Sequence, residues 1–177
     1  CIRDSRERDF ERGTLLLASF YLKEEQVDQA SMAYDSILQK NPMHLEALLQ
    51  RGLIHRDQEK YEQAFADFAH LITVADVRQG NEDDARLKRV GQYYYGATAS
   101  KSGQNIDEAI DVLKSVIGTS LASETRLKGF AYFHLAKLYL AKNEQGMARQ
   151  YLDEAKAFKK NKELKKQIKQ LEKSFSR

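Results

Sequence analysis

Residues 61–76 read YEQAFADFAHLITVAD and share the pattern of residues 27–42, VDQASMAYDSILQKNP. Three apolar positions coincide at an offset of 34 residues: Ala30 with Ala64, Tyr34 with Phe68 and Ile37 with Leu71. Self-similarity at a fixed period of this length is typical of stacked helical repeats, in which each unit buries its apolar face against its neighbours. This pair of segments predicts a repeat protein.

The same spacing of small and large apolar residues recurs twice further along the chain. Ala109 precedes Leu113 in IDEAIDVLKSV, and Ala148 precedes Leu152 in MARQYLDEA. The intervals between successive copies grow beyond the 34-residue period, so the third and fourth repeats are divergent. Extra residues at 78–89 and 118–128 are expected either to lengthen the following helices backwards or to form longer loops.

Helix is predicted for nearly the whole chain. The sequence contains one proline and is rich in Ala, Leu, Lys, Glu and Gln, which favour helices, and no alternating β-branched pattern indicates a strand. Short breaks such as KEEQ near residue 23 and AKNEQG near residue 143 leave about eight or nine helices. Helices joined by such short connections pack as antiparallel hairpins.

The sequence resembles the tetratricopeptide repeat family, whose 34-residue helix hairpins carry small residues at the eighth position, here Ala18, Gly52, Gly96 and Ala136. The resemblance implies an all-α right-handed superhelix of about four antiparallel hairpins in a single domain, residues 1–177. The expected repeats are 11–44, 45–78, 89–123 and 124–160, followed by a C-terminal capping helix at 161–175. Two departures are the absence of tryptophan and Arg51 in place of the usual leucine at position seven.

The resemblance also implies a concave groove built from the first helix of each hairpin. The expected partner-binding residues are Arg12, Leu15, Ser19, Glu46, Leu49, Leu53, Arg56, Tyr93, Phe130, Phe133 and Lys137. The apolar centre of this set suits a protein or peptide partner, such as the apolar face of an amphipathic helix. Alternatively, Tyr93, Phe130 and Phe133 pack between adjacent hairpins.

Some members of the family capture the C-terminal carboxylate of a chaperone with a clamp of Lys and Asn residues. The corresponding positions here are Leu15, Ser19, Gln50, Val90 and Tyr94. None of them supplies a cation, so no carboxylate clamp is expected.

Positive charge is concentrated in residues 156–177, KAFKKNKELKKQIKQLEKSFSR, which carry nine Lys or Arg against two Glu. Leu164, Ile168, Leu171 and Phe175 fall on one face of a helix in this segment. We expect this helix to cover the last hairpin and to present its lysines to water. Binding of nucleic acid or of an anionic membrane surface is the alternative, although the scarcity of arginine and interleaved aromatics disfavours base contact.

Catalytic chemistry finds little support in the sequence. His44, His55, His70 and His134 are scattered over different repeats without metal-ligand spacing, and no glycine-rich phosphate loop is present. We therefore expect no enzyme, no metal and no cofactor.

The expected function is that of a protein-interaction adaptor or scaffold. The alternative is a self-associating scaffold, with the groove or the extra residues at 78–89 and 118–128 forming the contact between copies. No apolar run is long enough to span a membrane. The single cysteine, Cys1, fits a reducing compartment and favours a cytoplasmic location, and a bacterial lipoprotein processed at Cys1 is a minor alternative.

Overall fold

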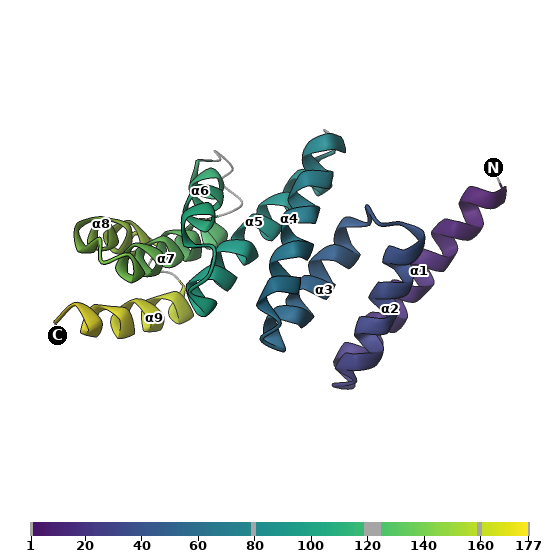
Figure 1. Cartoon of the computed structure of the whole chain (residues 1–177), viewed down its shortest axis with the longest axis horizontal. Helices are drawn as coiled ribbons and strands as arrows, with labels where there is room; N and C mark the ends of the chain where they lie inside the picture. The colour runs from purple at the N-terminus through teal and green to yellow at the C-terminus, as the bar shows by residue number, and fades with distance from the viewer. Residues whose placement is uncertain (1, 79–80, 119–124, 159–160, 177) are drawn as a thin grey trace. The chain divides into compact units, whose positions relative to one another are not determined.

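The computed structural model describes residues 2–78, 81–118, 125–158 and 161–176, and the regular elements in these ranges are helices. They are α1 (Ile2–Lys23), α2 (Val27–Lys40), α3 (Leu45–Asp57), α4 (Tyr61–Arg78), α5 (Glu82–Ser102), α6 (Ile106–Ile117), α7 (Thr125–Ala141), α8 (Gln145–Lys156), α9 (Lys162–Glu172) and the short 3₁₀ helix η2 (Lys173–Ser176) (Figure 1). The expected all-α fold of helix hairpins is confirmed. Among the described residues, no helix has both the length and the apolar character needed to cross a membrane.

The chain divides into two compact units, Cys1–Gly91 and Gln92–Arg177, and the boundary falls within α5. In the first unit α1 pairs with α2, α3 pairs with α4, and α2 also packs on α3 (Figure 1). In the second unit α7 pairs with α8, while α6 and α9 also pack on α7. Each unit therefore contains its own stack of neighbouring helices.

Glycine allows the close approach of paired helices at position eight of the repeat. A Cβ atom added to Gly52 of α3 would lie 2.6 Å from the ring of Phe68 in α4. A Cβ atom at Gly96 of α5 would likewise overlap the side chain of Leu113 in α6. These contacts explain why small residues recur there, since a larger side chain would push the two helices of a hairpin apart.

The turns inside three hairpins share one geometry. After α1 the amide of Gln26 donates to the carbonyl of Tyr21 and the amide of Glu25 to that of Leu22, which is a Schellman motif. The same pair of bonds follows α3 and α7. The residue in the left-handed conformation is Glu25, Glu59 or Asn143, with φ of 58°, 61° and 62°. The turns at 25 and 59 are related by the repeat period.

Arg51, the departure at position seven, is explained by an ion-pair network inside the first unit. Its guanidinium donates to both carboxylate oxygens of the buried Asp67, at 2.6 and 3.1 Å, and to Asp35 at 2.7 Å. His55 Nδ1 lies 3.0 Å from the same Asp67 carboxylate. Arg51 thus links α2, α3 and α4 through charge where the family uses an apolar contact.

Helix α9 covers the second unit as the sequence predicts. Leu164 and Ile168 are 1% and 6% exposed, and they pack with Phe130, Phe133 and Leu152 of α7 and α8. Leu171 and Phe175 are partly buried against the same cluster.

Two helices begin earlier than the family pattern implies. Helix α1 starts at Ile2, well before the expected repeat boundary at residue 11, and α5 starts at Glu82. The extra residues 82–89 therefore lengthen α5 backwards, one of the two outcomes expected for this insertion. Cys1 and residues 119–124 of the second insertion lie outside the described residues.

Candidate functional site

The expected groove residues of the first unit lie on α1 and α3 and differ in exposure. Arg12 and Ser19 are exposed, while Leu49 is buried in the core. The remaining members are half-buried, namely Leu15, Glu46, Leu53 and Arg56. This surface is more polar than expected, because its most central leucine packs inward.

The hydroxyl of Tyr34 brings two of these residues together. Its pKa is raised, first by burial of the ring and second by the negative charge of Glu46, while a hydrogen bond with Ser19 acts in the opposite direction. Gln50 Nε2 donates to Glu46 Oε1 at 2.8 Å. Side chains of α1, α2 and α3 thus meet in one polar cluster.

The aromatic residues expected in the groove of the second unit lie against α9. Phe130 and Phe133 are 9% and 6% exposed and belong to the core between α7, α8 and α9, and Tyr93 packs against this core. The Tyr93 ring also meets His134 edge-on, with ring centroids 5.6 Å apart. In the described chain Phe130 and Phe133 hold the capping helix, which corresponds to the alternative of packing between helices.

An open pocket of about 570 Å³ lies between α7 and α9. From α7 it is lined by Phe133, His134 and Lys137, and α9 contributes Glu163, Lys166, Gln167, Gln170 and Leu171. Two of the expected groove residues, Phe133 and Lys137, therefore share a concave site. Its lining combines apolar side chains and an imidazole with two ammonium groups, one carboxylate and two side-chain amides.

Lys137 contributes a partly buried positive charge to this pocket. Its side chain is half-buried, and burial lowers the pKa of its ammonium. No hydrogen bond or ion pair joins this ammonium to another of the described residues. A partly desolvated cation without a partner favours the binding of an anionic group.

The α9 wall of the pocket was not predicted from the sequence, which places these residues on a solvated face. Glu163, Lys166, Gln167 and Gln170 occur at spacings of three, one and three residues, so they form a polar stripe beside the apolar face of α9. Such a stripe is indistinguishable from an ordinary solvated face until the packing of α9 on α7 is known.

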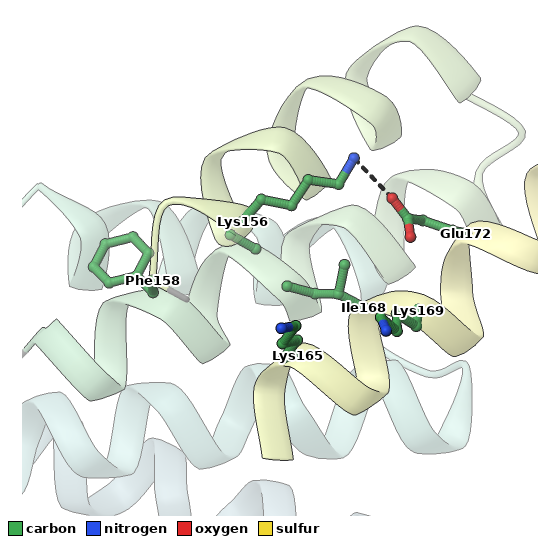
Figure 2. Close-up of a pocket in the computed structure, with 7 residues that line it drawn as sticks. Lys156, Phe158, Lys165, Ile168, Lys169 and Glu172 are labelled. Carbon is green, nitrogen blue, oxygen red and sulfur yellow. Dashed lines mark ion pairs between the residues drawn. The ribbon is translucent and has the colours of Figure 1, made fainter. Parts of the chain in front are cut away.

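A second, smaller pocket of about 380 Å³ lies on the other flank of α9. It has an apolar floor of Ala155, Phe158 and Ile168 and a charged rim of Lys156, Lys165, Lys169 and Glu172 (Figure 2). Lys156 is paired with Glu172 at 2.8 Å across the rim (Figure 2). Part of the positive charge of this flank is thereby neutralised within the protein.

A serine and a histidine meet between α5 and α7. Ser100 Oγ lies 2.7 Å from His134 Nδ1, and the same hydroxyl donates to the carbonyl of Ala97 at 3.0 Å. A serine nucleophile requires a base oriented by a third group and donors for an oxyanion, and this pair by itself supplies neither. Among the described residues, no three His, Cys, Asp or Glu side chains are grouped to hold a metal ion.

The family model for the tetratricopeptide repeat matches residues 45–76, which form the α3–α4 hairpin. No curated protein matches the sequence. Solved structures are similar over most of the chain. MamA of AMB-1 is 22% identical, with a TM-score of 0.65, over 83% of this chain and 78% of that chain.

The MamA RS-1 ArsTM double mutant is 17% identical, with a TM-score of 0.68, over 94% of this chain and 96% of that chain. A kinesin light chain fragment of Podosopora anserina with TPR-like repeats is 18% identical, with a TM-score of 0.62, over 84% of this chain and 74% of that chain. At these identities the likeness concerns the fold. The chain therefore carries a tetratricopeptide repeat at residues 45–76 and shares the fold of tetratricopeptide repeat proteins along most of its length.

Proposed function

We propose that this chain is a non-catalytic protein-interaction scaffold that holds a partner segment in the pocket between α7 and α9. The tetratricopeptide repeat match and the all-α hairpin fold support a scaffold in general. The observation that carries the specific proposal is the half-buried ammonium of Lys137, which lacks a partner among the described residues. The Ser100–His134 pair is assigned a structural role that links α5 to α7.

The chemistry of the pocket defines the kind of segment that it would hold. Leu171 and the small exposed part of Phe133 offer apolar surface, while Lys137 and Lys166 offer positive charge beside the carboxylate of Glu163. An amphipathic helix would satisfy both if it presents an apolar side chain together with an acidic residue one turn away. The acidic residue would restore to Lys137 the electrostatic stabilisation that burial removes, and the amide of Gln170 would set orientation, while the amide of Gln167 already donates to Glu163 Oε1.

Fluorescence anisotropy with two labelled amphipathic helical peptides tests this proposal. The peptides share one apolar face, and their polar faces carry either glutamate or lysine. We expect the acidic peptide to bind, and Lys137→Glu or Lys166→Glu to weaken binding by roughly tenfold or more, as expected for the reversal of a partly desolvated charge. The basic peptide should not bind measurably.

Lys169→Glu is the matched control, since Lys169 lies on the opposite flank of α9. It should leave the affinity nearly unchanged. An equal loss on Lys169→Glu would assign binding to the general charge of α9 and would favour the anionic-surface alternative. Failure of both peptides to bind would contradict the proposal.

A further inference from the structure

The outer face of α1 carries large apolar side chains that the described residues of the first unit leave exposed. Leu16, Leu17 and Phe20 are 66%, 46% and 54% exposed. Together with Gly13 they are spaced three, one and three residues apart, so they lie on one face of the helix. A Cβ atom at Gly13 would meet nothing within 4 Å. This face, defined by Gly13, Leu16, Leu17 and Phe20, is the α1 patch.

The equivalent face of the next hairpin is covered by a helix. At the offset of 34 residues, Gly13 corresponds to Ala47 and Phe20 to Ile54, and both of these α3 residues are buried. Helix α2 packs on α3. Leu16 and Leu17, however, correspond to Gln50 and Arg51, which are polar and half-buried, so the α1 patch is a helix-docking face that is more apolar than its counterpart on α3.

A second copy cannot cover the α1 patch with the last hairpin of its own second unit. That hairpin already packs its apolar surface against α9, where Leu164 and Ile168 are buried. Head-to-tail stacking of copies would require α9 to be displaced. A second copy does offer its own α1 patch, which is an exposed apolar helix face of matching length.

We propose that two copies of this chain associate through their α1 patches, with the two α1 helices antiparallel about a two-fold axis. At 100° per residue, Gly13 and Phe20 lie near the centre of the face, with Leu16 and Leu17 to either side. Antiparallel pairing with its centre between Leu16 and Leu17 puts Phe20 of one copy over Gly13 of the other. The leucines then face their own counterparts, as an isologous contact requires.

The charges at the two ends of α1 complement each other in this arrangement. Arg6 and Glu24 lie on one side of the patch, and Asp9 and Lys23 lie on the other, all four exposed. The two-fold axis lies in the interface and is perpendicular to both helices, so each side of one patch lies against the same side of the other copy's patch. It therefore brings Arg6 next to Glu24 of the second copy, and Asp9 next to Lys23 of the second copy. A parallel two-fold pairing would instead bring Arg6 next to Asp9 of the second copy and Glu24 next to Lys23 of the second copy, so the two alignments differ in which charges meet.

The size of the contact indicates a weak dimer. Three half-exposed large side chains and their charged rim would bury roughly 600 Å² on each copy, which is near the lower limit of specific interfaces. We therefore expect dissociation in the micromolar range and a concentration-dependent mass.

Sedimentation equilibrium of the full chain, from about 1 to about 200 µM, measures this association. We expect the average mass to rise toward twice that of the monomer. Leu16→Glu with Phe20→Glu should keep the mass monomeric without loss of helicity by circular dichroism. Met32→Glu is the control, because Met32 is 69% exposed on α2 and its equivalent in the next repeat, Ala66 of α4, is also exposed.

A charge exchange tests the antiparallel alignment. Arg6→Glu and Glu24→Arg should each weaken dimerisation several-fold, and the double variant should restore it. A monomeric mass at every concentration, or equal disruption by Met32→Glu, would overturn the proposal. Failure of the double variant to restore the dimer would overturn the antiparallel pairing. None of these substitutions touches the pocket between α7 and α9, so peptide binding is tested separately.

Discussion

The α1–α2 hairpin and the α7–α8 hairpin differ in the exposure of an apolar helix face. On α1 the outer face is open, with Leu16 and Phe20 more than half exposed. On the α7–α8 hairpin the apolar face is closed by α9, which buries Leu164 and Ile168. A repeat hairpin has an apolar face toward each neighbour, and that face is either covered by another element or available to another molecule.

The closed end also carries a pocket to which its capping helix contributes. In covering α7, helix α9 supplies one wall of the pocket around Lys137. A capping helix thus both removes apolar surface from water and adds polar groups to a site. At the open end, the same apolar surface remains available to a second copy.

The strongest test of this comparison is truncation of one leucine at each end. Leu164→Ala should lower the free energy of unfolding of the second unit by about 3 kcal/mol, because it leaves a cavity beneath α9. Leu17→Ala should change the stability of the monomer by less than about 0.5 kcal/mol, since its side chain remains in water. Urea unfolding at low protein concentration measures both. Similar losses at the two positions would contradict the distinction between a closed and an open end.

Two glycines, Gly13 in α1 and Gly129 in α7, differ in the space available for a larger side chain. A Cβ atom at Gly129 of α7 would lie 2.9 Å from Leu164 and Phe158, whereas Gly13 has open space. Gly13→Ala should stabilise the monomer by up to about 1 kcal/mol through helix propensity. Gly129→Ala should cost about 1 kcal/mol, because crowding against α9 outweighs that gain. Thermal unfolding should separate the two variants, and an equal gain at Gly129 would show that α9 is loosely held.

The smallest effect concerns the ion pair at the closed end. Hydrogen bonds with Asp153 and then Glu172 raise the pKa of Lys156, so this contribution to stability is complete below the unfolded pKa and is lost as pH rises through the folded value. Glu172→Gln should cost about 0.5 kcal/mol at neutral pH, because the pair is largely exposed. It should also reduce the loss of stability in alkaline solution. A cost above that of Leu164→Ala would mean that charge, rather than apolar contact, holds α9.

The hairpins and the capping helix could be predicted because they depend on local pattern. Small residues such as Gly52 and the apolar face of α9 repeat at fixed spacing, and spacing determines which residues share a helix face. The confirmed parts of the fold follow from this rule. The ion-pair role of Arg51 could not be predicted in this way, because its partners Asp35 and Asp67 lie on other helices.

The candidate site was harder to predict for the same reason. The sequence places Lys137 and Phe133 on one face of α7, and both line the pocket, but whether a face is groove or packing surface depends on what lies against it. The burial of Phe130 and the polar wall of the pocket both come from α9. Contacts between elements far apart in sequence leave no local signal.

The left-handed turns bear on how this chain could be engineered. Glu25 and Glu59 occupy positions that glycine fills in most Schellman motifs, so the hairpin imposes a backbone conformation that glutamate disfavours. The strained backbone at Glu25 and Glu59 therefore lowers the stability of the two hairpins that contain these turns. Glycine at these two positions would release that strain without altering any packed surface, which makes the turns the natural starting points for building a more robust version of the scaffold.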